Sequence, residues 1–528
     1  MIKVGIDVGG TNTDAVLLDG NRIATAVKVS TSDDVTAGIR AALGGLARTA
    51  ADLANVEAVI VGTTHFINAV VQRRGLEPVG VIRIGSPASR SLLPYCDWPK
   101  DLAGEVNHGI WSVAGGHEYD GRPFAALDEV AIKTAARQIS DKGLATVAIC
   151  SVFSPVNAEH ETRAAELVRE VAPDIAITLS SSLGRIGILE RENVALLNAA
   201  LIGLARRVAG AVISAVREQG ITAPVYFSRN DGTIADIETT IRQPVYSFAS
   251  GATNSMRGAA FLSGLKEAIV ADVGGTTTDV GLLRHGFPHE ANSVVEVGGV
   301  RTLFRMPDVI SIGLGGGSIV AEGGGRIGPQ SVGFRLTSEA LVFGGTVSTA
   351  TDYAVAMGLA KIGEAVDPTT FPRTSKAAFM GRCRSLVEET VDRAKIQSGD
   401  LPLLAVGGGA FLVPDEVAGI TEVVRVDYAE CANAVGAALA QVSGEVDRIY
   451  RDVPRDDALE DARQRATERA VRAGACRDTL ELIDLEEVPL AYLPGQSVRV
   501  RARVVGDMRQ LADGPRDEAG SGNDSREA

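Results

Sequence analysis

Short apolar runs alternate with amphipathic helical segments along most of the chain. Runs with the length of buried strands occur at 3–6, 58–62, 79–84, 145–150, 268–271 and 401–406. Apolar residues recur at helical spacing within 30–49, 127–142 and 159–171. Strands that alternate with helices are typical of an α/β fold with a mostly parallel sheet.

One eight-residue pattern occurs twice, at 7–14 and at 272–279. The first copy reads Asp-Val-Gly-Gly-Thr-Asn-Thr-Asp, and the second differs only in having Thr277 where the first has Asn12. Each copy lies between two strand-like runs, which predicts a strand, a tight Gly-Gly turn and a second strand. Glycines let backbone N–H groups approach a ligand, and Thr hydroxyls add donors that suit phosphate oxygens. A single copy could be an ordinary β-turn, but two matching copies favour a pair of phosphate-binding hairpins.

The predicted phosphate-binding residues are those of the two turns: Gly9, Gly10, Thr11, Asn12, Thr13, Gly274, Gly275, Thr276, Thr277 and Thr278. Asp7 and Asp272 end the first strand of each copy. A carboxylate does not bind phosphate directly, but it can hold Mg²⁺ or a water molecule beside it. We therefore expect Asp7 and Asp272 to be the catalytic carboxylates and the magnesium ligands.

At these residues the chain resembles the actin/sugar-kinase/Hsp70 ATPase superfamily. More narrowly, it resembles the hydantoinase/oxoprolinase family, whose A-type subunits begin with G-x-D-x-G-G-T-N-T-D. The resemblance extends over most of residues 1–445. It implies a two-domain actin-like (ribonuclease H-like) ATPase fold that binds ATP and Mg²⁺ between its domains. We expect domains at 1–185 and 186–445, a small C-terminal extension at 446–512 and a disordered tail at 513–528.

Further motifs match the family in order, with departures at Ile67, Arg229 and Asn230. The resemblance implies that Gly407, Gly408 and Gly409, which follow a strand, accommodate the adenosine. It also implies a substrate or cleft role for Thr63, Thr64, Asn68, Arg191, Asp231, Gly315, Gly316, Gly317, Ser318 and Asp352. Simpler explanations stay open: Thr63 could cap a helix, Glu190 and Arg191 could form a surface ion pair, and a glycine loop can pack against backbone as well as ligand.

Two other segments carry predictions about contacts. The stretch 86–125 reads as a long irregular loop with both tryptophans, which predicts a segment that lines the cleft or docks a partner. The stretch 429–443 reads as a closing helix, and its small residues predict tight packing across a domain interface. The stretch 456–472 alternates acidic and basic residues, which predicts a solvated helix.

Composition excludes several functions. A formal net charge of −14 argues against a nucleic-acid-binding protein. The five cysteines are scattered, so a disulfide framework is not expected. The apolar run 194–216 contains Arg206 and Arg207 and reads as a core helix, not a membrane span. The chain begins with a strand instead of a signal peptide, so we expect a cytoplasmic protein.

The resemblance implies a function. We expect an ATP-dependent hydrolase subunit that phosphorylates the carbonyl oxygen of a cyclic amide (hydantoin, oxoproline or lactam) before the ring opens. The family divides this work between two subunits, so we expect a B-type partner and an oligomer. The alternatives are an acetone-carboxylase-like or small-molecule kinase subunit, and an actin/Hsp70-like ATP switch that acts on a protein. The sequence contains no P-loop and no G-x-S-x-G elbow.

Overall fold

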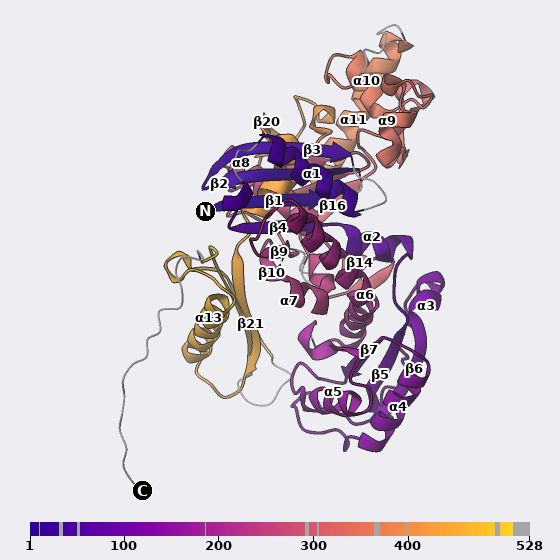
Figure 1. Ribbon diagram of the computed structural model, residues 1–528, viewed down its shortest axis with the longest axis vertical. Helices are drawn as coiled ribbons and strands as arrows, with labels where there is room; N and C mark the ends of the chain where they lie inside the picture. The colour runs from indigo at the N-terminus through magenta and orange to yellow at the C-terminus, as the bar shows by residue number, and fades with distance from the viewer. Residues whose placement is uncertain are drawn as a thin grey trace. The chain divides into compact units, whose positions relative to one another are not determined.

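The computed structural model describes residues 1–9, 11–30, 35–49, 53–184, 186–290, 295–303, 306–363, 370–396, 399–490 and 497–509. These form two compact units, a large one that begins at Ile2 and ends at Ala440 and a small C-terminal one. Gly10 and the predicted tail at 513–528 lie outside the described residues. The alternation of strands and helices is that of the predicted α/β fold (Figure 1).

The first sheet of the large unit has the order β10-β9-β4-β1-β2-β3. Its strands are β1 (Ile2–Val8), β2 (Asn12–Asp19), β3 (Arg22–Ser30), β4 (Ala58–Thr63), β9 (Val225–Ser228) and β10 (Ile234–Asp236). β2 is antiparallel to both β1 and β3, and β4 and β9 run parallel to β1. Because β9 and β10 belong to this sheet, the predicted domain boundary at 185/186 divides it.

The second sheet repeats this plan. Its strands are β11 (Ala268–Val273), β12 (Thr278–Arg284), β13 (Phe287–Pro288), β16 (Val309–Ile312), β19 (Leu401–Val406) and β20 (Ile420–Arg425). β11, β12 and β16 are antiparallel, and β19 and β20 follow β11 in parallel. The core between this sheet and α11 (Arg373–Ala394) contains Phe379, Cys383 and Val387. The repeated hairpin pattern therefore reflects a repeated sheet.

A third sheet is inserted in the first half. It has the all-parallel order β6-β5-β7-β8, formed by β5 (Val79–Ser86), β6 (Asn107–Ala114), β7 (Thr146–Ser151) and β8 (Ala176–Leu179). Its helices are α4 (Glu129–Asp141) and α5 (Glu159–Val171).

The expectation of an irregular loop at 86–125 is wrong, because this stretch contains α3 (Lys100–Val106) and the edge strand β6. The strand was hidden because only Val113 of its eight residues is buried. Trp98 also does not form an exposed docking surface. It is buried and donates to Asn193 Oδ1 at 2.7 Å.

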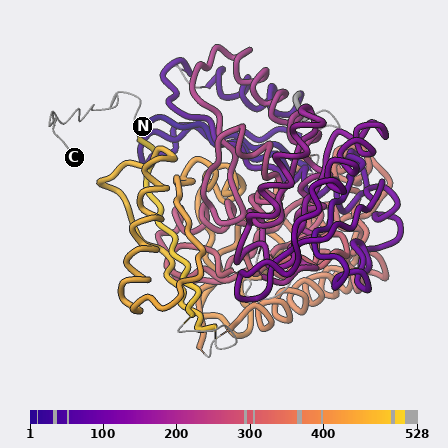
Figure 2. Tube along the Cα trace, turned by 90° about the horizontal axis from the view of Figure 1, so that it is seen from below, coloured from indigo at the N-terminus to yellow at the C-terminus, as the bar shows by residue number. Residues whose placement is uncertain are grey.

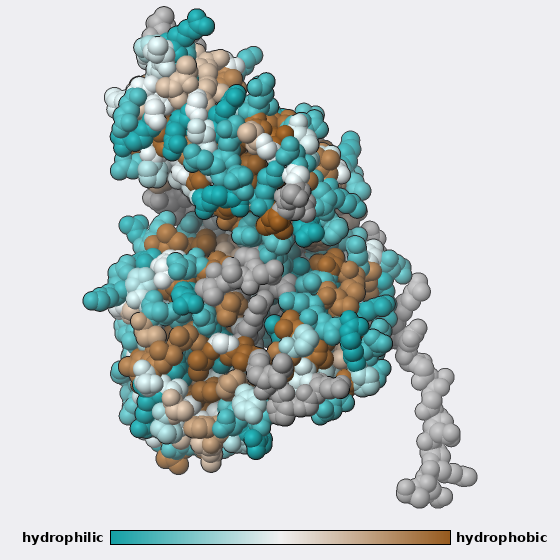
Figure 3. All heavy atoms as spheres, turned by 180° about the vertical axis from the view of Figure 1, so that it is seen from behind, coloured by the Kyte–Doolittle hydropathy of each residue, from teal (hydrophilic) through white to brown (hydrophobic). Residues whose placement is uncertain are grey.

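The long helix α6 (Ile188–Glu218) links the inserted sheet to the first sheet. By length and apolar composition alone it could cross a membrane. Most of its first half is buried, including Val194, Leu197 and Leu201, and it belongs to the main core of the first half. On the face drawn in Figure 3, hydrophobic and hydrophilic residues are interspersed.

Two helices carry glycines where the backbones touch. They are α8 (Ser250–Ser263) and α12 (Ala432–Ala438). A Cβ on Gly258 would overlap the carbonyl oxygen of Ala432, and one on Gly436 would overlap that of Asn254. A Cβ on Gly5 of β1 would overlap the carbonyl oxygen of Ala434. These segments are far apart along the chain, whose course is coloured by residue number in Figure 2, and they are in contact in the structure. The small residues predicted in 429–443 thus pack tightly, but the helix ends at Ala438 and a strand begins at Val442.

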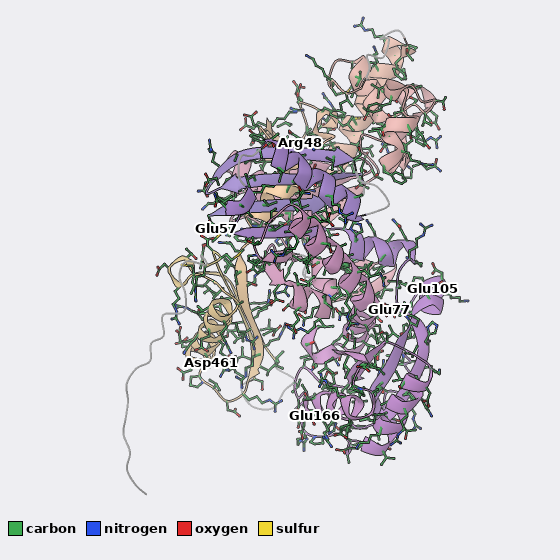
Figure 4. All side chains as sticks on the ribbon, in the orientation of Figure 1. Arg48, Glu57, Glu77, Glu105, Glu166 and Asp461 are labelled. Atoms are coloured by element: carbon green, nitrogen blue, oxygen red, sulfur yellow. The ribbon has the colours of Figure 1, made fainter. Side chains whose placement is uncertain are left out.

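The C-terminal unit is an antiparallel sheet with one helix. Its strands have the order β21-β23-β22, formed by β21 (Val442–Tyr450), β22 (Glu481–Pro489) and β23 (Val498–Gly506). Helix α13 (Arg455–Arg472) is not solvated on every side. Its buried alanines Ala458, Ala462, Ala466 and Ala470 form one stripe, and Gly444 of β21 lies against Ala466. Asp461, labelled in Figure 4, pairs with Arg465 at 2.6 Å. The unit begins at 441, not at the predicted 446.

Candidate active site

The two predicted hairpins have the same backbone geometry. In the first, β1 and β2 pair with Asp7 opposite Asp14, and Gly9 N–H donates to Asn12 O at 3.0 Å. In the second, Asp272 lies opposite Asp279, and Gly274 N–H donates to Thr277 O at 2.8 Å. The equal registers place one carboxylate at the same point of each half.

The hairpin tips touch each other. A Cβ built on Gly275 would lie 2.8 Å from Thr11 Oγ1 and 3.1 Å from Thr11 Cβ. Thr276 and Thr277 are exposed, and Thr11 and Asn12 are partly exposed. The two turns therefore face one shared site, and four of the predicted donors lie at its surface.

The remaining two threonines point away from that surface. Thr13 and Thr278 are fully buried at equivalent positions of the two hairpins. The Thr278 hydroxyl donates to Leu314 O at 2.6 Å, and Thr13 Oγ1 lies close to Gly38 of α1 (Val35–Thr49). Because side chains alternate between the faces of a strand, these hydroxyls serve the core and not a phosphate.

Asp7 is a buried carboxylate with one unsatisfied oxygen. It is 3% exposed, and Asn433 Nδ2 of α12 donates to its Oδ2 at 3.3 Å. Its Oδ1 has no hydrogen-bond partner among the described residues. Burial, with the nearby charges of Asp14 and Asp272, raises the pKa of Asp7 to about 7 against the opposing effect of Asn433.

Asp272 has a similar environment in the second half. Burial and the charge of Asp279 raise its pKa to about 6, and the nearby Ser255 hydroxyl of α8 opposes this shift. Its pKa also responds to Lys28 of the first half, as that of Asp7 does. The two carboxylates thus belong to one electrostatic site, although 265 residues separate them in the chain.

Each hairpin has a second carboxylate, Asp14 or Asp279, on its second strand. The next strand, β3 or β16, provides a partner for it, and the two partners differ. Lys28 of β3 lies opposite Asp14 and its Nζ is 2.6 Å from Asp14 Oδ1. Ser311 of β16 lies opposite Asp279 and donates to Asp279 Oδ1. Sequence reasoning missed Lys28. The signal available was its position 14 residues after Asp14 in a strand-like run, which allows hairpin pairing.

Helices α8 and α12 supply the other polar groups that sequence reasoning missed. They are Asn254, Ser255 and Asn433. Asn254 Nδ2 donates to Ser228 Oγ at 2.9 Å, and its Oδ1 is buried without a partner among the described residues. A Cβ on Gly62 would lie 2.8 Å from Asp7 Oδ1 and 2.5 Å from Asn254 Nδ2. Glycine at 62 therefore makes room for the polar atoms beside Asp7.

Three of the predicted cleft residues lie beside the first hairpin. Thr64 is the N-cap of α2 (His65–Gln72), and its N–H and hydroxyl both donate to Val8 O at 3.4 Å. Asn68 donates to Thr64 Oγ1 at 3.3 Å. Thr63 accepts from or donates to His65 Nδ1 at 2.7 Å. The structure thus brings Thr63, Thr64 and Asn68 together at the end of β1.

The predicted adenosine loop lies beside the second hairpin. Gly407 has φ 87°, and a Cβ there would overlap Asp272 Oδ1. Gly409 N–H donates to Val273 O at 2.8 Å. Gly408 has open space where a Cβ would be, so this position faces away from packed atoms. The loop is therefore placed where a ligand of the second hairpin could touch Gly408.

Gly315, Gly316, Gly317 and Ser318 support the second turn. Gly316 and Gly317 N–H donate to Gly274 O and Gly275 O at 3.0 and 2.7 Å. A Cβ on Gly315 would lie 2.6 Å from Thr276 N. Gly315 N–H donates to Ser318 Oγ at 2.9 Å. The sequence left open whether this loop packs against backbone or contacts a ligand. In the structure it packs against the backbone of the second hairpin.

The other predicted cleft residues form internal structural contacts. Arg191 is fully buried and donates to Ser180 Oγ, Ser151 O and Ile186 O, so it forms no surface pair with Glu190. Asp352 closes the capping box of α10 (Ala350–Ala356) with Thr349. Asp231 accepts from Thr233 in the β9–β10 turn.

The duplicated sheet with its paired hairpins agrees with the predicted actin-like fold. Models of the hydantoinase/oxoprolinase family match the chain twice: the N-terminal region matches residues 3–172, and the main hydantoinase/oxoprolinase region matches residues 191–379. Together they cover more than half of the chain, which belongs to the hydantoinase/oxoprolinase family.

Curated relatives are distant. The chain is 27% identical over 424 residues to caprolactamase subunit alpha of Pseudomonas jessenii. The aligned region covers 75% of this chain and 60% of the relative. It is also 27% identical over 390 residues to the acetophenone carboxylase gamma subunit of Aromatoleum aromaticum. That aligned region covers 67% of this chain and 53% of the relative. The chain therefore spans only part of the length of these relatives.

Two solved structures share the fold. The crystal structure of the ATP-dependent caprolactamase from Pseudomonas jessenii has a TM-score of 0.76 at 20% identity, over 96% of this chain and 87% of that chain. The nucleotide-free structure of acetone carboxylase has a TM-score of 0.71 at 18% identity, over 96% of this chain and 88% of that chain. At these identities the likeness concerns the fold alone.

Proposed function

We propose that this chain is an ATP-dependent enzyme subunit that activates a cyclic amide by phosphorylating its carbonyl oxygen. The observation that carries the proposal is the meeting of two equivalent phosphate-type turns, at Thr11 and Gly275, with Asp7 and Asp272 behind them. Such a site can position a triphosphate and stabilise its charge, which is most of what phosphoryl transfer requires. The family and the caprolactamase relative favour a cyclic amide.

The proposed reaction begins with the amide, whose nitrogen lone pair makes the carbonyl carbon resistant to water. The carbonyl oxygen attacks the γ-phosphorus of ATP, the bond to the β,γ-bridging oxygen breaks, and ADP leaves. The product is an imidate-like phosphate with a much more electrophilic carbon. Water then adds to that carbon, the C–N bond breaks as the nitrogen takes a proton and leaves, and an acyl phosphate remains. A second water hydrolyses the acyl phosphate to a carboxylate and inorganic phosphate.

The donor set fits a magnesium ion. Mg²⁺ is usually bound by one or two carboxylates together with water and substrate phosphates. Asp7 and Asp272 would hold it, and the unpartnered Asp7 Oδ1 is an oxygen that a cation or its water could satisfy. When bound, Mg²⁺ neutralises charge on the phosphates. The exposed Thr276 and Thr277, with Thr11 and Asn12, would orient the phosphate oxygens.

A carboxylase subunit is the second candidate, because the acetophenone carboxylase gamma subunit is as similar to this chain as the caprolactamase subunit is. The same site would then phosphorylate the oxygen of an enolised ketone. We further propose that the chain works with a second subunit. The relatives are named as subunits.

The test is to assay the purified chain for phosphate release and ring opening together. We expect Mg-dependent ATP hydrolysis that a responsive lactam or hydantoin stimulates, with little ring-opened product by mass spectrometry. Stimulation only by ketones with bicarbonate would favour the carboxylase. Stoichiometric ring opening by the chain alone would contradict the need for a second subunit. Absence of ATP hydrolysis under every condition would contradict the whole proposal.

A further inference from the structure

The inserted parallel sheet has the topology of a ligand-binding sheet. The chain passes from β5 to β6 on one side and then to β7 on the other, which gives the order β6-β5-β7-β8. In open parallel sheets, ligands bind outside the carboxyl ends of the strands, where successive connections diverge to opposite sides. Here that point lies between β5 and β7, where Val152 N–H donates to Ile84 O at 3.0 Å. The sheet and its helices are visible in Figure 1.

A loop that we name the flap, residues 115–124, crosses this point. His117 N–H donates to Val152 O at 3.2 Å, and Phe124 N–H donates to Gly116 O at 2.9 Å. Gly116 has φ 97°, and a Cβ there would lie 3.3 Å from Val152 Cβ, so the crossing depends on glycine. The flap therefore covers the carboxyl ends of both β5 and β7.

Two buried polar side chains at this edge lack partners. His117 is 1% exposed, and neither of its ring nitrogens has a hydrogen-bond partner among the described residues. Ser151, the last residue of β7, is fully buried, and its hydroxyl is likewise unpartnered there. Buried polar groups are normally satisfied, so these atoms require an explanation. A ligand that enters under the flap provides one.

The neighbouring residues define what such a ligand would meet. His160 Nδ1 accepts from Gly116 N–H at 2.9 Å, and the His117 and His160 rings lie 4.3 Å apart. Burial lowers the pKa of both imidazoles, so each is neutral near pH 7 and His117 offers one N–H donor. The outer face of α5 is different: Glu166, labelled in Figure 4, pairs with Arg163 in solvent.

One arginine contributes a charged donor at this edge. Arg90 is exposed, and its Nε donates to Ser86 Oγ at the end of β5 at 2.7 Å. Two acids of α5 are near. Glu159 is exposed, and its charge opposes the lowering of the pKa of both imidazoles. Glu161 is buried, and its oxygens accept from Ser151 N, Ser180 Oγ and Ser181 N. Three donors, on His117, Ser151 and Arg90, are thus collected at one edge, and the buried acid is occupied.

We propose that the flap covers a second small-molecule site, separate from the hairpins, that binds a small organic carboxylate through His117, Ser151 and Arg90. The carboxylate accepts hydrogen bonds from the His117 ring N–H and the Ser151 hydroxyl. The Arg90 guanidinium adds a charge-assisted bond at the rim. The flap lifts for entry, because in the closed form the His117 ring itself is buried.

Histidine-selective ¹³C labelling tests the site, since the chain contains only six histidines. Titration of the full chain with acetate or 6-aminohexanoate is expected to shift the His117 and His160 signals saturably. Acetamide, which has the same shape without the charge, is expected to bind at least tenfold more weakly. Mg-ATP is expected to shift His65, which lies beside the first hairpin, so the nucleotide site is read separately.

Variants identify the donors. His117→Gln removes one signal and should abolish the carboxylate response of the other. Arg90→Ala changes an exposed side chain and should weaken binding about tenfold, the value expected for one charged hydrogen bond. Arg122→Ala, which changes an exposed arginine on the flap itself, is the matched control and should change nothing. A response equal with chloride or acetamide, or unchanged in Arg90→Ala, would overturn the proposal even if His117→Gln failed to fold.

Discussion

The two hairpins have the same registers, the same turn hydrogen bonds and equivalent buried threonines, yet their supports differ. The first hairpin has a cation on its third strand, where Lys28 pairs with Asp14. The second has a neutral hydroxyl there, from Ser311, and its turn is held by Gly316 and Gly317. Duplication therefore accounts for the shared geometry, whereas the charge and the support of the turn differ between the halves.

The largest effect is expected from the first carboxylate of each hairpin. Asp7→Asn and Asp272→Asn should each lower ATP turnover by about 10² to 10³-fold, since each removes charge that positions metal or water. Nucleotide binding and folding should survive, because asparagine has nearly the same volume. Steady-state phosphate release measures ATP turnover, and titration calorimetry measures nucleotide binding. Asp456→Asn, in the exposed first turn of α13, is the control; equal activity in all three variants would make the hairpins structural turns.

The third-strand partners should differ in their contribution to stability. Lys28→Met leaves Asp14 buried without its cation, and we expect a loss of about 2 to 3 kcal/mol in the free energy of unfolding. Ser311→Ala removes a neutral donor and should cost about 1 kcal/mol. Urea denaturation compares them. Equal losses would show that the Lys28 charge does not distinguish the two halves.

The glycine support of the second turn should be sensitive to one added carbon. Gly315→Ala places a methyl group against Thr276 N and should destabilise the protein by about 1 to 3 kcal/mol. Gly408→Ala, whose Cβ would meet open space, should leave stability unchanged and serves as the control. Thermal unfolding measures both. A neutral Gly315→Ala would mean that the second turn is as adjustable as the first.

The smallest expected effect is a pH dependence. The folded-state pKa values of Asp7 and Asp272, about 7 and about 6, lie above the ordinary value of 3.8. Between pH 4 and 7 the folded chain therefore binds more protons than the unfolded chain, and these groups make stability fall as pH rises. Asp7→Asn should flatten this slope at pH 5 to 7. An unchanged slope would indicate that Asp7 is already ionised throughout this range.

The sequence predicted the parts of this site that lie within one continuous pattern. The strands, turns and carboxylates of both hairpins could be read directly, because the same eight residues recur between apolar runs. Lys28, Asn254 and Asn433 could not, because their roles depend on strand register and helix packing between distant segments. The supporting role of Gly315 could not be separated from ligand contact, since both require the same close approach. The edge strand β6 was missed because it lacks a buried face.

The glycine contacts of α8 and α12 have a mechanical consequence. Side chains that interlock must disengage before two helices can turn against each other. Where Gly258 meets Ala432 and Gly436 meets Asn254, backbone rests on backbone, because neither glycine has a side chain to interlock. Such a contact holds the two helices together but offers little resistance to a rotation of one helix against the other. Helix α8 also carries Asn254 and Ser255, which lie beside the first carboxylates of the two hairpins. A small rotation of α8 against α12 would therefore lengthen or shorten the distance between Thr11 and Gly275, while each carboxylate stays in its own sheet.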